Sequence, residues 1–379
     1  MSKVKWPARV PDLTLSYDSA QARARGREDG YRSGYHEGYL RGRADVIASR
    51  RADPVPFRQI RVLYIASGKG FPYSPLDEAI SSTLRSMVAE VIIIEPGQLT
   101  VEAVLQAAPD LVLVLDGMFV NNEMMDTVRQ LGIRSAVWLT DDPYYTDMTM
   151  ENVKHYDYIF TLESNCIPYY QQLGCTHVYH LPFAAHTEYY RPSRNISPLR
   201  RDVSFIGSAY WNRIAFFDPI IDRLMQHKTV INGIWWDRLP KYTAYQDRIE
   251  LNKWMGPAET AEAYNGSKIV INLHRSHEDD TVNNNAVKIP AASPNPRTFE
   301  ISACATLQIS DSRSDLAKYY TPGVEIETYS SPEELLDKIE YYLAHEEERR
   351  QIALNALERT FRDHTYSKRL NEMLSIIYA

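Results

Sequence analysis

Arg297 and Glu300 are the two residues whose types and spacing point most directly to chemistry. They open a short predicted helix that follows a Pro-containing loop at 293–296 and precedes a predicted strand at 306–310. Three-residue spacing places both side chains on one face of the first turn, where free backbone N–H groups and the helix dipole attract anions. A guanidinium for phosphate beside a carboxylate for two ribose hydroxyls suits a nucleoside diphosphate. The same spacing also fits an ordinary ion pair that caps a buried helix.

Two carboxylates, Asp141 and Asp142, come directly after a predicted strand at 135–139 and before Pro143. Ligands of α/β sheets bind at the carboxyl ends of strands, so a carboxylate there can orient an acceptor hydroxyl or act as a general base. An Asp followed by Pro is also a common helix start, with the Asp as N-cap. The sequence leaves both interpretations open.

A third candidate site is the segment from Gly207 to Arg213. A predicted strand at 202–206 ends at the glycine, and the arginine lies at the start of the next predicted helix, 212–227. A strand, a glycine and a helix N-terminus with a cation often cradle phosphate, although Arg213 could equally be a solvated helix residue. The chain has neither GxGxxG nor GxxxxGK[ST], and the two histidines of the polar segment 274–280 are a weak metal signal, so no metal site is predicted.

Short apolar strands alternate with helices along most of the chain, which predicts parallel sheets covered on both faces. The strands predicted in the first half are 61–66, 91–94, 111–115, 135–139, 158–161 and 178–181. Prolines and polar residues interrupt the pattern at 182–198, where we place the link between two domains. The strands predicted after the link are 202–206, 230–234, 269–273, 306–310 and 324–328. The predicted fold class is therefore α/β, with two Rossmann-like domains facing a central cleft.

The N-terminal segment has a different character. Between residues 21 and 51 it is charged and helix-prone, with glycines at four-residue spacing, of which three precede tyrosines: Gly30, Gly34, Gly38 and Gly42, and Tyr31, Tyr35 and Tyr39. Each glycine costs a helix about 1 kcal/mol relative to Ala, so we expect the stripe to pack closely on the chain's own body or on a second copy in a homodimer. A flexible leader is the alternative.

These patterns divide the chain into four predicted parts. They are a helical extension (1–55), a first Rossmann-like domain (56–190), a second one (191–365) and a C-terminal helix (366–379) that can cross back to the first domain. The composition, with 44% hydrophobic and 24% charged residues, is that of a globular protein. A net charge of -7 gives no support to nucleic-acid binding. Without a membrane-length apolar run or an apolar signal core, the protein is expected in the cytoplasm.

Several short segments together resemble the CgeB/YkvP-like spore maturation glycosyltransferase family, which has the GT-B fold of two Rossmann-like domains. The resemblance covers roughly residues 60–375 and is specific through the order and spacing of its segments rather than through any one of them. These segments are 138–143, 156–161, 181–192, 203–207, 267–275, 296–300, 319–325 and 364–369.

The resemblance implies an enzyme that moves a sugar from a nucleotide-diphospho-sugar, most simply a UDP-sugar, to a hydroxyl of a glycan or protein destined for a cell or spore surface. The donor would bind the second domain and the acceptor the first. By family position, Glu300 would hold the ribose and Arg213 the diphosphate. The full predicted donor set is Gly207, Arg213, Arg275, Asn295, Arg297, Thr298 and Glu300, with no cofactor beyond the donor.

Two departures from the broader family leave the outcome of the reaction open. Related retaining enzymes carry a glutamate eight residues before Glu300 that touches the sugar, and here that position is Ala292; the usual glycine after the small-residue helix is replaced by Ala305. If the reaction inverts configuration, Asp141 or Asp142 is the predicted base; if it retains, the carboxylates would position the acceptor. A binding module without turnover and a nucleotide-sugar epimerase are the alternative functions.

Overall fold

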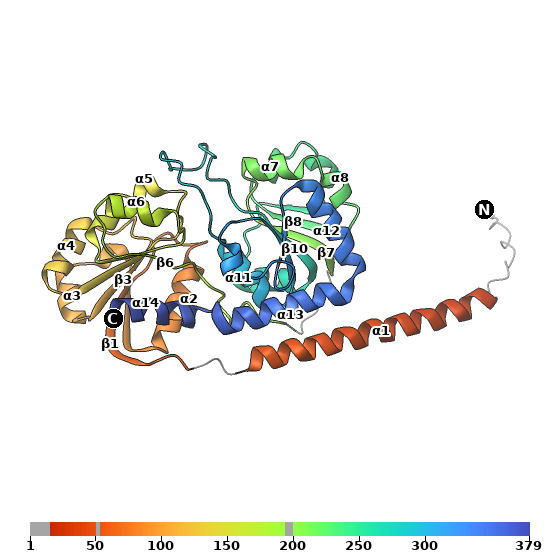
Figure 1. Cartoon of the computed structure of the whole chain (residues 1–379), viewed down its shortest axis with the longest axis horizontal. Helices are drawn as coiled ribbons and strands as arrows, with labels where there is room; N and C mark the ends of the chain where they lie inside the picture. Colours follow the sequence, from red (N-terminus) through yellow and green to blue (C-terminus); the bar gives the residue numbers. More distant parts are fainter. Residues whose placement is uncertain (1–15, 51–53, 194–199) are drawn as a thin grey trace, which may run out of the picture.

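The computed structural model describes residues 16–50, 54–193 and 200–379. It contains two six-stranded sheets in two lobes that lie side by side, with a long helix extending away from them (Figure 1). All neighbouring strands in both sheets are parallel. The predicted α/β fold with two Rossmann-like domains is confirmed.

The first lobe, called the N-lobe here, holds the sheet of order β2-β1-β3-β4-β5-β6. Its strands are β1 (Arg58–Ile65), β2 (Val88–Ile94), β3 (Leu111–Leu115), β4 (Arg134–Trp138), β5 (Tyr158–Thr161) and β6 (Val178–His180). Its helices are α2 (Ser74–Arg85), η1 (Pro96–Gln98), α3 (Val101–Ala107), α4 (Asn122–Gln130), α5 (Thr146–Thr149), η2 (Asn152–His155) and α6 (Cys166–Gln172). Every residue of β3 is buried, as expected for an inner strand covered on both faces.

The second lobe, the C-lobe, holds the sheet of order β12-β11-β10-β7-β8-β9. Its strands are β7 (Arg201–Ile206), β8 (Thr229–Gly233), β9 (Ile249–Leu251), β10 (Ser267–Asn272), β11 (Leu307–Asp311) and β12 (Glu327–Tyr329). Its helices are α7 (Trp211–Phe217), α8 (Ile221–Leu224), η3 (Trp236–Arg238), α9 (Tyr242–Tyr245), α10 (Pro257–Asn265), α11 (Pro296–Ala303), η4 (Leu316–Lys318), α12 (Pro332–Ala344) and α13 (Glu346–Asp363).

The C-lobe differs from the sequence prediction in two places. The single helix predicted at 212–227 is two helices, α7 and α8, because Pro219 lies between them and cannot donate the backbone hydrogen bond that a continuous helix needs. Strand β9 was not predicted, since only Ile249 of its three residues is buried. Its pairing with β8 nevertheless completes the sheet.

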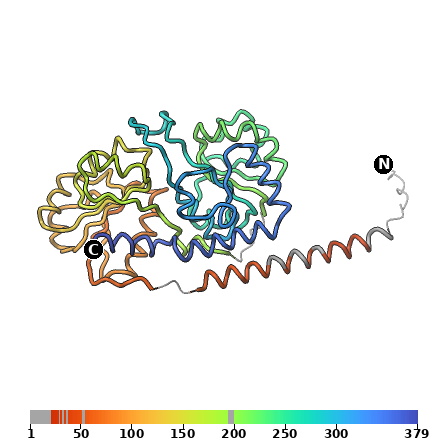
Figure 2. Tube along the Cα trace, viewed as in Figure 1, coloured from red at the N-terminus to blue at the C-terminus, as the bar shows by residue number. Residues whose placement is uncertain are grey.

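The C-terminal helix α14 (Tyr366–Ile377) belongs to the N-lobe in space, although it follows the C-lobe in sequence. Its buried face joins the N-lobe core through Leu370, Met373, Leu374 and Ile377. In the Cα trace, α13 and α14 form one path beneath both lobes (Figure 2). The chain therefore crosses between the lobes twice, once after β6 and once before α14.

Among the described side chains of helix α1 (Ser16–Ser49), those of its C-terminal part pack on the body. Leu40, Ala44 and Ile47 pack against Leu354 and Leu357 of α13. The rest of α1 points away from the lobes (Figure 1).

The glycine stripe of α1 is not covered by the described part of the chain. A Cβ atom added at any of its glycines would meet nothing within 4 Å. The neighbouring ring of Tyr31 is 76% exposed and that of Tyr35 is 63% exposed. The close packing that the stripe predicts is therefore not made with the described residues of the same chain.

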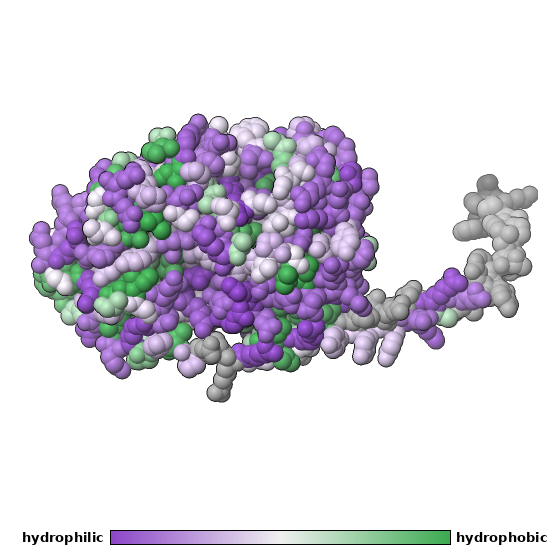
Figure 3. Space-filling view, in the orientation of Figure 1, coloured by the Kyte–Doolittle hydropathy of each residue, from purple (hydrophilic) through white to green (hydrophobic). Residues whose placement is uncertain are grey.

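Most of the visible face of both lobes is hydrophilic, with small apolar patches (Figure 3). Within the described ranges, no helix combines the length and the apolar character needed to cross a bilayer.

Candidate active site

Two adjoining cavities lie where the carboxyl ends of the two sheets face each other. The larger, of about 350 Å³, is lined by both lobes. The smaller, of about 200 Å³, is lined mainly by the C-lobe. Ser208, Arg297 and Glu300 line both, so the two cavities form one continuous cleft. This is the edge at which α/β sheets bind ligands.

Arg297, in the first turn of α11, and Glu300, in the next turn, both line this cleft. Glu300 is half-buried, and burial raises the pKa of its carboxyl to about 7, against the lowering effects of the Arg297 charge and a hydrogen bond from Tyr190. The arginine is also close enough to Arg213 to lower the pKa of that guanidinium. The cleft therefore combines positive charge with a carboxyl group whose pKa lies near neutral pH.

Asn295 and Thr298 build the start of α11. The Asn295 side-chain oxygen accepts the Thr298 backbone N–H at 3.1 Å, and its amide donates to Asn272 at 2.8 Å. Thr298 is completely buried, and its hydroxyl accepts a hydrogen bond from the Asn272 amide. Burial under the helix turn makes the Thr298 side chain a support for the residues that line the cleft, and the predicted contact of Thr298 with a donor stays a prediction.

Tyr190 and Tyr264 lie beside Glu300 and were not predicted as site residues. The Tyr190 hydroxyl donates to the Glu300 carboxylate. The Tyr264 hydroxyl is buried without a hydrogen-bond partner, although its residue lines the smaller cavity. Tyr190 lies in a segment that carries the family resemblance, which was an available signal, whereas nothing in the local sequence singles out Tyr264.

Asn232, at the end of β8, is a second buried polar group of the smaller cavity. Its side-chain amide donates to Glu250, but its side-chain oxygen has no partner. Buried polar atoms are nearly always hydrogen-bonded, so an unsatisfied one at a cavity suggests a ligand contact. Together, Asn232, Tyr264 and Glu300 give the smaller cavity the features of a site for a hydrogen-bonding ligand.

Gly207 allows two guanidinium groups to approach the end of β7. A Cβ atom added there would lie 2.8 Å from Arg213 Nη1 and 3.4 Å from Arg297 Nη2. Arg213 itself is only 2% exposed, and its guanidinium donates to the backbone oxygens of Leu273 and Ser208. Burial, and then the charge of Arg297, lowers the Arg213 pKa to about 9.

These bonds restrict, but do not exclude, the predicted contact of Arg213 with a diphosphate, and the side chain lines the larger cavity. Of the five N–H donors of a guanidinium, three of those of Arg213 go to these two carbonyls, so a diphosphate would have to use the remaining ones. The side chain ties the loop after β7 to the end of β10, and its buried charge adds to the positive potential beside Arg297.

Arg275 lies at the boundary between the lobes. Its guanidinium carbon is 4.7 Å from the ring centre of Tyr144 and 5.2 Å from that of Tyr145 in the N-lobe, and 4.8 Å from that of Tyr210 in the C-lobe. One nitrogen donates to Val282, while the buried Nε has no partner. Arg275 thus lines the larger cavity between aromatic rings that suit the apolar faces of sugars.

On the N-lobe side, Asp141 is part of a polar cluster at the ends of β1, β3 and β4. Its Oδ2 accepts hydrogen bonds from Tyr73 at 2.8 Å, Thr140 at 3.1 Å and Lys69 at 3.3 Å. Lys69 also contacts Asp116 at 2.5 Å. All of the bonds described for this carboxylate reach Oδ2, so Oδ1 is left for a ligand in the cleft.

Sequence reasoning missed Lys69, Tyr73 and Asp116. Lys69 lies in the glycine-containing turn after β1, and Asp116 directly follows β3, so the rule that chemistry gathers after strands would have found both. Burial, with a smaller effect of the Asp141 charge, raises the pKa of Tyr73, which keeps its hydroxyl a proton donor to that carboxylate.

Asp142 lines the larger cavity, but its carboxyl is largely engaged by N-lobe side chains. It is 6% exposed, and its two oxygens accept hydrogen bonds from Thr161 at 2.5 Å and Tyr170 at 2.8 Å. Burial raises its pKa to about 7, partly offset by these two hydroxyls. Because both Asp142 oxygens already accept hydrogen bonds, Asp141 is the better placed carboxylate of this pair for an acceptor in the cleft.

The predicted histidine segment serves the C-lobe structure. His274 Nδ1 contacts Asp311, and its Nε2 accepts the backbone N–H of Asn295 at 2.9 Å. No cluster of three or more potential metal ligands is found among the described residues.

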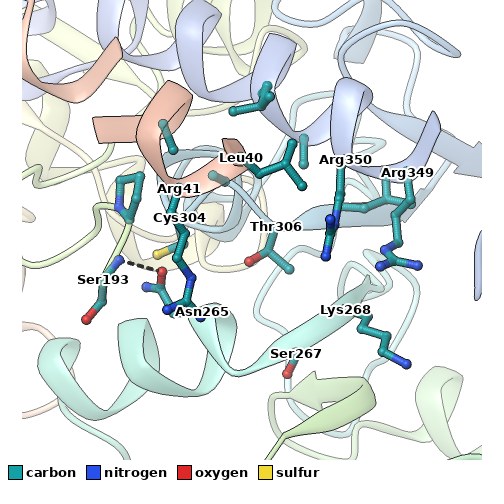
Figure 4. A pocket seen from close by; sticks show the side chains of 16 residues that line it. Leu40, Arg41, Ser193, Asn265, Ser267, Lys268, Cys304, Thr306, Arg349 and Arg350 are labelled. Atoms are coloured by element: carbon teal, nitrogen blue, oxygen red, sulfur yellow. Dashed lines mark hydrogen bonds between the residues drawn. The ribbon is translucent and has the colours of Figure 1, made fainter. Parts of the chain in front are cut away.

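A third cavity, of about 170 Å³, lies away from the cleft, between α1 and the C-lobe (Figure 4). Its lining includes the basic residues Arg41, Lys268, Arg349 and Arg350, together with polar and apolar side chains. Glu346 pairs with both arginines and Asp202 with the lysine. These two acids offset part of the positive charge, and Leu40, Arg41 and Ala44 of α1 form one wall of the cavity.

Comparison with known proteins agrees with this geometry. The family described as "Glycosyl transferase-like" matches residues 213–375. The chain is 30% identical over 311 residues to Spore protein CgeB of Bacillus subtilis (strain 168), a match that covers 82% of this chain and 96% of that protein.

Two solved structures share the fold. Anabaena Alr3699/HepE, in complex with UDP and glucose, gives a TM-score of 0.58 at 12% identity and covers 84% of this chain and 100% of its own. The sucrose-phosphate synthase of Thermosynechococcus elongatus gives a TM-score of 0.57 at 10% identity. This match covers 85% of this chain and 99% of that one. The lobes, cleft and family match define a glycosyltransferase with the GT-B fold. Within this class, the chain belongs to the family of Spore protein CgeB.

The structural position of Asp142 predicts a specific dependence of stability on pH. Its pKa is 3.8 when unperturbed and about 7 in the fold, so unfolding between these values releases a proton. This residue therefore lowers the free energy of unfolding as pH rises, by up to about 1.4 kcal/mol per pH unit. When the free energy of unfolding is measured in urea at pH 5, 6 and 7, the Asp142→Asn variant is expected to lack this part of the decrease with pH. Parallel pH profiles for the two proteins would contradict the assignment.

Proposed function

We propose that this glycosyltransferase takes a sugar from a UDP-sugar held by the C-lobe and attaches it to a hydroxyl of an acceptor held by the N-lobe. The observation that carries the proposal is the pairing of Arg297 and Glu300 in the cleft, with unsatisfied polar groups beside them. A related fold that was solved with UDP and glucose supports this choice of donor.

The nucleoside would occupy the smaller cavity. Glu300 accepts the two ribose hydroxyls, and Tyr264 and Asn232 supply a hydroxyl and an amide oxygen to the nucleoside. Arg297 and the N-terminus of α11 face the diphosphate. As the bond to the sugar breaks, negative charge grows on the leaving phosphate, and a preorganised guanidinium stabilises that charge more than it stabilises the ground state.

The acceptor would occupy the larger cavity, beside Asp141. Lys69, Tyr73 and Thr140 hold Oδ2, and Oδ1 accepts the attacking hydroxyl. We propose Asp141 as the base that receives the proton of this hydroxyl, which corresponds to inversion at the anomeric carbon. The tyrosine rings that line this cavity favour a glycan or a glycosylated protein as acceptor.

The biological setting of the acceptor is also part of the proposal. The curated relative is named as a spore protein. We propose transfer to a component of a spore or cell surface, carried out in the cytoplasm before that component is assembled.

The donor site predicts the effects of two substitutions on UDP binding. Glu300→Ala removes the acceptor of two hydroxyls, and Arg297→Ala removes a phosphate contact, so each is expected to weaken UDP binding roughly 10- to 100-fold. Isothermal titration calorimetry measures this change directly. Tyr264→Phe, which removes one oxygen atom, is expected to weaken binding less. UDP affinity unchanged in both alanine variants would refute the site.

Glu300→Gln provides the matched control for this measurement. The free carboxyl has a pKa of about 7, and ribose hydroxyls donate to its ionised form, so wild-type affinity is expected to rise between pH 6 and pH 8. The Gln variant lacks this titration. Because ionisation of UDP itself affects both proteins equally, the difference between their pH profiles reports Glu300.

The acceptor site predicts a separate kinetic effect. Asp141→Asn keeps the size of the side chain but removes the base, so transfer is expected to fall by roughly 10²- to 10⁴-fold. UDP affinity is expected to stay at the wild-type value. The assay is release of UDP from a panel of UDP-sugars with glycan acceptors, and the anomeric configuration of the product tests inversion. Sugar interconversion without an acceptor would instead establish an epimerase.

We further propose that the glycine face of α1 packs against α1 of a second copy. Gly34→Leu and Gly38→Leu each add a large side chain where a Cβ has nothing within 4 Å in the single chain. Leu favours helix more than Gly does, so neither variant weakens α1 itself. Light scattering is expected to give a dimer for the wild type and a monomer for the double variant. The same mass for both would refute this contact.

A further inference from the structure

Residues 274–295, called the strap here, connect β10 to α11 and belong to the C-lobe in sequence, yet they bond extensively to the N-lobe. In Figure 1 this segment rises from the C-lobe toward α5 and α6. Its two ends are fixed in the C-lobe, where Arg313 donates to the backbone oxygens of Arg275 and Ala291 at 3.1 and 2.6 Å.

The first anchor of the strap on the N-lobe is the segment around α5. Asn284 exchanges two backbone hydrogen bonds with this segment, one with Tyr144 at 2.8 Å and one with Asp147 at 3.0 Å. The Asp147 carboxylate also accepts the Ala286 N–H with both oxygens, at 2.9 and 3.1 Å. Tyr144 lies three residues after Asp141, so this anchor supports the acceptor side of the cleft.

The second anchor is the turn between β5 and α6. Glu163 Oε2 accepts the backbone N–H groups of Ala292 and Ser293 at 2.9 and 3.0 Å, although Glu163 is only 2% exposed. Asn165 donates to the backbone oxygen of Pro290 at 2.9 Å. Hydrogen bonds from backbone N–H groups to a buried charge are stronger than neutral ones.

Three further contacts join the lobes near this anchor. The Ser164 hydroxyl donates to Asp315 of the C-lobe at 2.6 Å, and the Ser293 hydroxyl contacts His180 of the N-lobe at 3.0 Å. Ile289 of the strap is 6% exposed and packs in the N-lobe core. The strap therefore combines charge-assisted, neutral and apolar contacts with the N-lobe, rather than resting on its surface.

The strap also joins the two halves of the reaction site. It ends at Asn295, the cap of α11, which carries Arg297 and Glu300. Its anchors lie next to the segment that holds Asp141. We infer that the strap holds the two lobes at one fixed angle, and that Glu163 and Asp147 are positioning residues that set the spacing between the donor and acceptor sites.

Loss of the strap contacts is expected to change the geometry of the lobes as well as the stability of the fold. Lobes joined only by linkers are expected to hinge, because interdomain contacts are usually small. Losing the anchors would let the lobes separate while Arg297 and Glu300 stay in place on α11. Donor binding would then persist, but the acceptor hydroxyl would be displaced and water would enter, so hydrolysis of the donor would replace transfer.

Pulsed EPR distances between the lobes test this inference without a known substrate. Nitroxide labels are placed at Leu105→Cys on α3 and Asp337→Cys on α12, both highly exposed, while the native cysteines are buried. The wild-type chain is expected to give one narrow distance distribution that UDP does not change. In Glu163→Ala/Asp147→Ala the distribution is expected to broaden, and UDP affinity to stay within about twofold. A broad or UDP-shifted distribution in the wild type, or a narrow one in the double variant, overturns the inference.

Two controls separate positioning from general damage. Glu163→Gln/Asp147→Asn keeps an acceptor oxygen at each anchor and is expected to restore the narrow distribution. Asp157→Ala removes a carboxylate that accepts the Ser135 N–H at the amino end of β4, which is the end of the N-lobe strands away from the strap. It is expected to lower the melting temperature but to leave the distance distribution unchanged; broadening in this variant would reduce the strap effect to general destabilisation and refute the inference.

The kinetic part of the inference rests on the proposed UDP-sugar reaction. With the donor that the wild type uses, the double variant Glu163→Ala/Asp147→Ala is expected to lower the ratio of transfer to hydrolysis at least tenfold. The double variant Glu163→Gln/Asp147→Asn is expected to restore this ratio. If UDP fails to bind the wild type, the proposed donor is wrong, while the EPR distances still test the strap. An unchanged ratio in the alanine pair would refute the positioning role.

Discussion

Parallel strands all end at the same edge of their sheet, and the site of this protein depends on that constraint. Two such edges face each other here, so residues that follow different strands meet in one cleft. Lys69 follows β1, Asp116 follows β3 and Asp141 follows β4, while Gly207 follows β7. The topology of the sheets brings these residues together, and at Asp116 the backbone also takes the left-handed conformation, with φ of 72°.

Burial then decides which of the charged residues can take part in chemistry. Asp142 and Arg213 are nearly inaccessible, and hydroxyls or carbonyls already engage them. Arg297 and Glu300 remain at the cavity surface, where a ligand can satisfy them. Leaving a buried polar group unpaired costs free energy. The unsatisfied Tyr264 hydroxyl is therefore also a group that a ligand can satisfy. The division between structural and ligand-binding groups thus follows from whether the protein already satisfies a polar group, rather than from residue type.

Transfer of a sugar to a hydroxyl requires the two halves of the cleft to keep a common geometry and to exclude water. Two segments tie the lobes together: α14 follows the C-lobe in sequence and packs in the N-lobe core, and the strap bonds to the N-lobe mainly through hydrogen bonds. The glutamate that related retaining enzymes carry at position 292 is absent, yet Glu163 brings a carboxylate to the backbone N–H of Ala292 from the other lobe. The chain thus joins donor and acceptor sides through contacts that cross the cleft.

The sequence by itself determined most of the strands, the division into two lobes and the pair Arg297 and Glu300, because hydrophobic periodicity and i,i+3 spacing depend on neighbouring residues. Pro219 even carried the local signal that breaks the predicted helix at 212–227. Only the tertiary structure decided that Asp141 rather than Asp142 serves the cleft, and that Lys69 joins Asp116 and Asp141, which lie 47 and 72 residues away. The partner and the solvent access of a side chain depend on residues distant in sequence, so no local pattern contains them.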